Sequence, residues 1–280
     1  MIARTMKRIL PLLLVLAAGS TMLAQLPAPN AEGVSAGHHI FRAKDIDAAN
    51  KFWMTLGGEP TALATIKLIR FPGVLLYISS AAGRAGAPPT PSLGGNHGTT
   101  VEFITFKVKD LKASLEKWKA AGIEPMKQYE PTTLLAPDDI QVRIIEDKSL
   151  SVPIASDGIE MNVANTGEVS AWYTKWFGAM VISTRNGTLG PFTMAKIPGI
   201  QIVFRETKDP IAPTKGHSLA LLGFEVKDIQ AFVRKYQEAG GKFDGNGTIA
   251  TSAAANLSVI QLTDPWGTSI EVSQGLAAVK

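Results

Sequence analysis

The chain has 280 residues, a formal net charge of +4 and no cysteine. The lack of cysteine excludes disulfides, thiolate nucleophiles and thiolate metal sites, so a metal would need histidine and carboxylate ligands. Three of the basic residues, Arg4, Lys7 and Arg8, lie at the start of the chain, and the rest is nearly neutral with no basic stripe for binding nucleic acid.

Residues 1–24 predict a secretory signal peptide. The three early basic residues precede an apolar run, Ile9–Ala18, and small residues follow around Ala24. This run is short for a membrane span, which needs roughly 20 apolar residues. We therefore expect the leader to be cleaved and the protein to be secreted or periplasmic, with no membrane attachment afterwards. Residues 25–37 are small and polar, and they predict a flexible tether.

Internal repeats organise the rest of the chain. The segment from Phe103 (FITFKVKDLKASLEKWKAAGIEP) matches the one from Leu221 (LLGFEVKDIQAFVRKYQEAGGKF), and each predicts a strand followed by an amphipathic helix. A weaker pair starts at His38 and Gly158, with a short strand, a helix rich in Trp and Phe, and a Gly exit. Short β-like stretches follow each helix. The chain is therefore predicted to contain four βαβββ modules at residues 38–80, 101–154, 158–206 and 219–273.

One module cannot bury its sheet face alone, so the modules should join in pairs. Links rich in Pro and Gly separate the first module from the second and the third from the fourth. We expect these consecutive modules to pair, giving a first domain at residues 38–156 and a second at residues 157–275. Each pair would enclose one cup.

The closing motif DPWGTSIEV, residues Asp264–Val272, and the alternation of module types resemble the vicinal oxygen chelate superfamily. This superfamily includes glyoxalase, bleomycin-resistance and extradiol dioxygenase proteins. The resemblance covers nearly the whole chain after the leader. It implies an α+β fold in which four βαβββ modules pair into two curved mixed-sheet half-barrels with helices outside. It also implies that Glu271 faces a cup, because the family places a metal-binding Glu there.

The resemblance implies a His ligand seven residues before the residue that opens each helix. That count gives His38 in the first module, but Phe103, Gly158 and Leu221 in the other three. Three of the four positions therefore lack ligand atoms. In the first cup, His38 would stand nearly alone opposite Phe103, either as a weak metal ligand or hydrogen-bonded inside the sheet. Tyr77 should face the same cup and could bind a small ligand through its ring and hydroxyl group.

Glu160 lies two residues after Gly158, so it should point to the same face of its strand. We expect it to look into the second cup with Glu271. These two carboxylates could hold a cation, act as acid and base, form a solvated acidic patch, or pair with Arg205.

Two functions remain open at this stage. The first is a secreted protein that binds a small molecule in a metal-poor cup, without a cofactor, through Tyr77, Phe103, Arg205 and Leu221. The second is a glyoxalase-like lyase or extradiol dioxygenase with one divalent ion (Zn, Fe, Mn or Ni) on Glu271, Glu160 and His38, the two carboxylates being catalytic. Because the family's ligand atoms are mostly missing, binding is favoured. The protein is expected to be a monomer or a homodimer.

Overall fold

The computed structural model describes residues 26–81, 94–127, 132–188 and 190–279. The predicted signal peptide lies outside these residues. Within them, no helix is long and apolar enough to cross a membrane.

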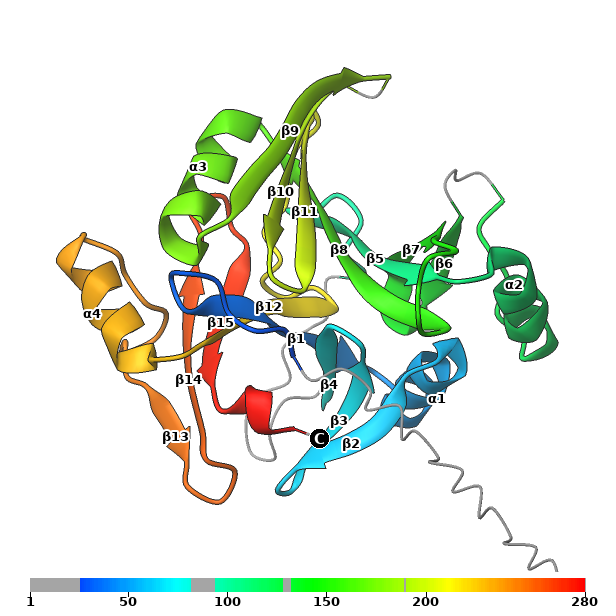
Figure 1. The fold of residues 1–280 in the computed structure, drawn as a ribbon, viewed down its shortest axis with the longest axis horizontal. Coiled ribbons are helices and arrows are strands. Elements are labelled where there is room, and N and C mark those ends of the chain that lie inside the picture. The colour runs from blue at the N-terminus through cyan, green and yellow to red at the C-terminus, as the bar shows by residue number, and fades with distance from the viewer. Residues whose placement is uncertain (1–25, 82–93, 128–131, 189, 280) are drawn as a thin grey trace, which may run out of the picture.

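The four predicted modules are present, each beginning with a strand and a helix (Figure 1). Three strands follow the helix in modules 1, 3 and 4, as predicted, whereas two follow it in the described part of module 2. Modules 1 and 2 contain β1 (Val34–Ala43), α1 (Ile46–Leu56), β2 (Glu59–Leu63), β3 (Ile66–Phe71), β4 (Val74–Ser80), β5 (Val101–Val108), α2 (Leu111–Ala120), β6 (Thr133–Ala136), η1 (Pro137–Asp139) and β7 (Ile140–Glu146). Modules 3 and 4 contain β8 (Ile154–Val163), α3 (Thr166–Phe177), β9 (Met180–Gly187), β10 (Gly190–Ile197), β11 (Ile200–Glu206), β12 (Leu219–Val226), α4 (Ile229–Glu238), β13 (Ala250–Ser252), β14 (Leu257–Thr263), β15 (Ser269–Gln274) and η2 (Leu276–Ala278).

All four helices begin with the same capping interaction. The side chains of Asp45, Asp110, Asn165 and Asp228 each accept a hydrogen bond from a backbone N–H in the first helical turn. Such a bond satisfies one of the donors that a helix start leaves free. The repeated cap fixes the same turn from strand to helix in every module, so positions can be compared between modules by counting from it.

The strands form two mixed sheets, which confirms the predicted fold class. The eight-stranded sheet has the order β13-β14-β15-β12-β1-β4-β3-β2, and the seven-stranded sheet has the order β6-β7-β5-β8-β11-β10-β9. Module 1 therefore pairs with module 4, and module 2 with module 3. The predicted pairing of consecutive modules is wrong, while the division into domains at residues 38–156 and 157–275 stays a prediction.

The connections explain this pairing. Only residues 147–153 separate β7 from β8, and this short link keeps modules 2 and 3 in one sheet, with β5 antiparallel to β8. The two long links, residues 81–100 and 207–218, instead carry the chain from one sheet to the other. From their length and their Pro and Gly content, these two links were predicted to join modules that share a sheet. In the structure, each of them instead joins modules that belong to different sheets.

Aromatic side chains fill the space between the sheets. In module 1, Trp53 of α1 stacks on Phe41 of β1 and also lies 6.0 Å, centroid to centroid, from Phe106 of the other sheet. In module 3, Tyr173 of α3 lies 5.4 Å from Phe204 and 6.4 Å from Phe224, which again belong to different sheets. These helices thus join the two sheets through one continuous core.

The predicted tether is shorter than expected. Strand β1 already begins at Val34, and the Asn30 side chain donates hydrogen bonds to the carbonyl oxygens of Phe177 and Gly178 at the end of α3. Residues from Asn30 onward therefore belong to the fold, because Asn30 caps a helix of another module.

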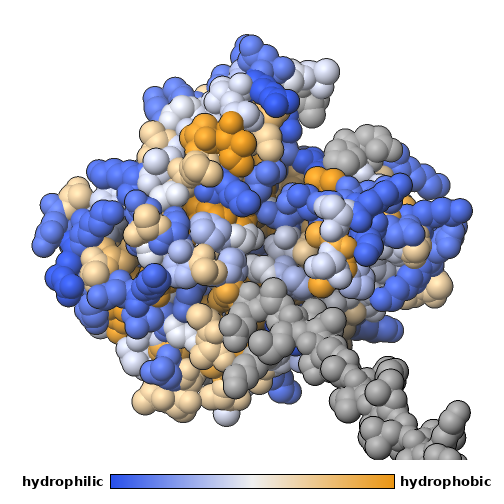
Figure 2. Space-filling model, viewed as in Figure 1, coloured by the Kyte–Doolittle hydropathy of each residue, from blue (hydrophilic) through white to orange (hydrophobic). Residues whose placement is uncertain are grey.

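Strand β9 forms one edge of the seven-stranded sheet and is largely exposed. Its first residues, Met180, Val181 and Ile182, are exposed by 65%, 47% and 51%. Figure 2 shows apolar surface in this part of the molecule. An exposed apolar strand edge is a site at which chains can associate.

His39 is the most unusual polar residue of the core. It is 2% exposed, and neither ring nitrogen has a hydrogen-bond partner among the residues that the structure describes. Burial, with a smaller effect from neighbouring His38, lowers the pKa of His39 from 6.5 to about 3. The folded protein therefore holds this imidazole in its neutral form at neutral pH.

Mild acid should destabilise the fold through His39. The unfolded chain binds a proton at this residue below pH 6.5 and the folded chain only near pH 3. The stability linked to neutral His39 is thus complete above the unfolded pKa and is lost as pH falls through this window, by up to about 1.4 kcal/mol per pH unit. Chemical denaturation of the wild type and His39→Leu at about pH 7 and about pH 5 should show a smaller loss in the variant. Parallel losses in both proteins would contradict this role.

Candidate functional site

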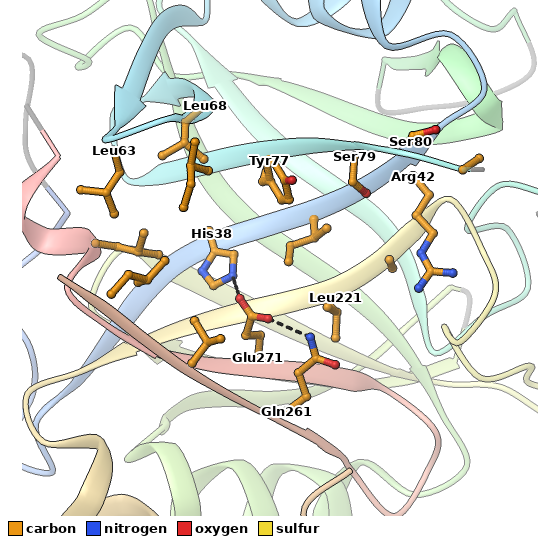
Figure 3. A pocket seen from close by; sticks show the side chains of 17 residues that line it. His38, Arg42, Leu63, Leu68, Tyr77, Ser79, Ser80, Leu221, Gln261 and Glu271 are labelled. Carbon is orange, nitrogen blue, oxygen red and sulfur yellow. Dashed lines mark hydrogen bonds and ion pairs between the residues drawn. The ribbon is translucent and has the colours of Figure 1, made fainter. Parts of the chain in front are cut away.

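A pocket of about 650 Å³ lies on the concave face of the eight-stranded sheet (Figure 3). This volume is within the range of roughly 300–1,000 Å³ that is typical of small-molecule sites. Its walls come from β1 to β4 of module 1, from β12, β14 and β15 of module 4, and from Leu276 after the last strand. The pocket therefore exists only because the first and last modules pair.

A short row of polar side chains lies in this pocket. His38 of β1 and Glu271 of β15 are 4% and 8% exposed, and His38 Nε2 lies 2.9 Å from Glu271 Oε1. The other carboxylate oxygen, Oε2, accepts a 2.8 Å hydrogen bond from Gln261 of β14 (Figure 3). Both oxygens of Glu271 thus have a partner, and His38 is not isolated as the sequence suggested.

The position of the His38 ring depends on a glycine. A Cβ atom added to Gly223 of β12 would overlap the imidazole, including Nδ1. The absence of a side chain at Gly223 thus leaves room for the His38 ring, and in this position the ring contacts Glu271. His38 Nδ1 is buried and has no hydrogen-bond partner among the described residues.

The pKa of Glu271 reflects competing effects. Burial raises this pKa, but the hydrogen bond and charge of His38 and the hydrogen bond from Gln261 outweigh burial and lower the pKa below its ordinary value. Glu271 is therefore a carboxylate at neutral pH, and it can accept hydrogen bonds but cannot donate one.

The sheet register shows what stands at the family's other ligand positions. Glu271 pairs with Gly223, two residues after Leu221, and Tyr77 pairs in the same way with Ile40, two residues after His38. Tyr77 therefore occupies in module 1 the place that Glu271 occupies in module 4. Likewise, Leu221 occupies in module 4 the place of His38.

These four positions do not fit the divalent ion of the resembled family. Leu221 has no donor atom, Tyr77 offers a phenol in place of a carboxylate, and both Glu271 oxygens are engaged within the protein. In the part of the chain that the structure describes, no group of three or more His, Cys, Asp or Glu side chains could hold a metal. His38 and Glu271 alone are a poor ligand set for a structural or catalytic ion.

Apolar side chains and one cation complete the pocket. Leu63, Leu68 and Leu257 lie on its walls, and Tyr77 faces it from β4. Arg42 stands at the far end of β1 from His38 (Figure 3), and it forms no ion pair with any described residue. The pocket thus combines an apolar body, a carboxylate and a free positive charge.

The corresponding face of the seven-stranded sheet is filled instead. Glu160 is bound by both Arg143 and Arg205, the latter through a 2.6 Å contact from Nε to Oε1. Burial raises the pKa of Glu160, but hydrogen bonds and charges of the two arginines lower it overall. Arg143 also lies over the Phe103 ring, 3.8 Å from its centroid. Only about 50 Å³ of open space remains at this cluster.

The expectation that Glu160 shares a cup with Glu271 is therefore wrong, because the two residues belong to different sheets. The alternative in which Glu160 pairs with Arg205 is the one observed. Phe103 likewise does not lie opposite His38.

Of the predicted site residues, the structure brings together His38, Tyr77, Leu221 and Glu271 in the large pocket, whereas Phe103, Glu160 and Arg205 lie apart from it. Sequence reasoning missed Arg42 and Gln261. Arg42 could have been found, because it lies four residues after His38 and so points to the same face of the strand. Gln261 required the antiparallel pairing of β14 with β15, which places it opposite Glu271.

Comparisons with known proteins agree with the fold. The family model of the Glyoxalase/Bleomycin resistance protein/Dioxygenase superfamily matches residues 156–272. No curated protein matches the sequence.

Two solved structures share the fold over most of the chain. Glyoxalase I from Zea mays is 14% identical, with a TM-score of 0.63, and the match covers 87% of this chain and 93% of that one. A putative dioxygenase from Bacillus subtilis is 11% identical, with a TM-score of 0.57, covering 90% and 86%. At these identities the likeness is one of fold. Residues 156–272 thus match the Glyoxalase/Bleomycin resistance protein/Dioxygenase superfamily, and the chain as a whole shares the fold of these two structures.

Proposed function

We propose that this protein binds a small molecule in the pocket between modules 1 and 4, without a resident metal ion. The observation that carries the proposal is the pocket itself, which is open and largely apolar. Of the four positions at which the resembled family has metal ligands, two are occupied here by Tyr77 and Leu221. A ligand there would gain apolar burial from the leucine walls and orientation from a few polar groups.

The polar groups favour a particular kind of ligand. Glu271 accepts hydrogen bonds, so the ligand would present a donor such as a hydroxyl or amine near the middle of the sheet. Arg42 supplies a positive charge at one end, so an acidic group on the ligand would lie there. We therefore propose a small acid that also carries an apolar body and a hydrogen-bond donor.

The setting that we propose follows from the sequence. A cleaved leader at residues 1–24 would place the protein in the periplasm or outside the cell, where it would meet small molecules as a monomer or homodimer. The near balance of basic and acidic residues after the leader supports a small-molecule ligand over nucleic acid.

A divalent-metal enzyme of the glyoxalase or dioxygenase type is the second candidate. The meeting of His38 and Glu271 in one pocket favours it, since both residue types bind such ions. The poor ligand set weighs against it. Elemental analysis of protein purified natively from the exported fraction separates the two, because about one Zn, Fe, Mn or Ni per chain would overturn the metal-free proposal.

Filling the pocket should abolish ligand binding. Leu221→Trp places a large ring in the pocket, while the exposed substitution Lys67→Ala serves as a matched control on the same sheet. A ligand found by native mass spectrometry and added back at one hundred times its Kd should stabilise the wild type and the control by about 2.7 kcal/mol. Leu221→Trp should show no such gain in thermal unfolding. An equal gain in all three proteins would place the ligand elsewhere.

Gly223→Ala should disturb the polar row without removing any of its members. The added methyl group displaces the His38 ring, so Glu271 loses a partner that lowers its pKa, and that pKa should rise. We expect a loss of about 1–3 kcal/mol of unfolding free energy from the forced repacking and the weakened pair. The pKa of Glu271, followed by NMR of the carboxyl carbon, should move upward. An unchanged pKa would show that His38 does not depend on Gly223.

Restoring two ligands should create a metal site. In the double variant Tyr77→Glu with Leu221→His, two Glu and two His side chains would face the same pocket, as the register requires. This variant should bind Zn²⁺ about 100-fold or more tightly than the wild type in competition with a chelating dye. The size-matched control Tyr77→Gln with Leu221→Asn should not. Equally tight binding by the wild type would show that His38 and Glu271 already suffice.

A further inference from the structure

A second cavity, of about 450 Å³, lies between α1 and α2. It shares no lining residue with the pocket on the eight-stranded sheet. Its walls come from the end of α1, from β2 and β3 of module 1, from α2 of module 2, and from residues 152–154 at the start of β8.

The equivalent space on the other side of the molecule is packed solid. There α3 and α4 lie side by side, and their aromatic residues meet directly (Figure 1). The rings of Trp176 and Tyr236 are 4.7 Å apart, and those of Phe177 and Phe232 are stacked at 5.8 Å. These contacts fill the gap between the two helices.

Counting from the N-caps shows why the first gap is hollow. The positions of Trp176 and Phe177 in α3 correspond to Leu56 and Gly57 at the end of α1. The position of Phe232 in α4 corresponds to Ser114 in α2, and that of Tyr236 corresponds to Trp118.

Three large aromatic side chains are thus replaced by smaller ones at the α1–α2 gap. Of the four aromatic positions, only the last keeps a ring, since Trp118 stands where α4 has Tyr236. Leu56, Gly57, Ser114 and Trp118 all line the cavity. The lining includes exposed residues such as Ala113 and Lys117, so the space is a cleft open to solvent, and the smaller side chains leave room in it for a ligand of aromatic size.

The charges around the cavity favour an anion. Lys109 and Lys117 line it and form no ion pair with any described residue. Its two carboxylates are already engaged, because Glu59 accepts from Arg70 at 2.7 Å and Asp110 caps α2. A ligand with a negative group would find free lysines at the rim and apolar contacts below.

We propose that the α1–α2 cavity is a second binding site, which takes a planar aromatic anion such as an aryl carboxylate or sulfonate. The ring would occupy the space left by the absent aromatic side chains and contact Trp118. The acidic group would lie at Lys109 and Lys117. This site is independent of the proposed function, since neither pocket contributes to the other.

The probe for this site is 8-anilinonaphthalene-1-sulfonate, and its uncharged analogue N-phenyl-1-naphthylamine is the matched control for charge. Titration is carried out on the wild type and on Leu221→Trp, whose other pocket is filled. One dye molecule per chain should still bind to Leu221→Trp. Absence of this bound dye, or its loss on filling the other pocket, overturns the proposal.

Ser114→Phe restores the side chain that α4 carries at the same position, and it should weaken dye binding about tenfold or more in the Leu221→Trp background. Lys117→Glu reverses the charge of an exposed side chain at the rim, so it tests the role of this charge without filling the cavity. It should weaken the sulfonate about three- to tenfold and leave the uncharged analogue unaffected. Unchanged sulfonate binding in Ser114→Phe or in Lys117→Glu overturns the proposal, and circular dichroism checks that each variant is folded.

Discussion

The antiparallel pairing of β1 with β12 is the interaction on which the candidate site depends. It joins the first module to the last and places His38 next to Glu271, which lies 233 residues further along the chain. The register is irregular between Ala36 and His39, and Gly223 on the partner strand leaves room for the His38 ring. Because side chains alternate along a strand, a shift of one residue would turn His38 away from the pocket.

The four modules could be predicted from the sequence, but which modules share a sheet could not. Capping residues such as Asp45 and Asp228 mark a local event, the turn from strand to helix, so four modules could be located from the chain alone. Which modules share a sheet depends on contacts between distant strands, and the long Pro/Gly links allowed both arrangements. The short link at residues 147–153 was the better signal, because a short connection leaves little freedom.

The same distinction applies to the site. Glu271 and His38 were found from the spacing of the resembled family, but their contact needed the correct partner modules. Glu160 was assigned to the wrong cup for that reason, and its two arginines come from β7 and β11, which only the assembled sheet brings together. Burial of a charge between two opposite charges is a tertiary property, and strand alternation cannot reveal it.

The crossed pairing of modules also sets an order of events during synthesis. Modules 2 and 3 are neighbours in the chain, so β5 and β8 can pair as soon as both exist. Module 1 is made first, yet its partner β12 begins only at Leu219. Until then β1 can pair with β4 on one side only, and its other edge waits for β12, because contacts of such long separation form slowly. The eight-stranded sheet, and the pocket on it, can therefore close only when nearly the whole chain is available.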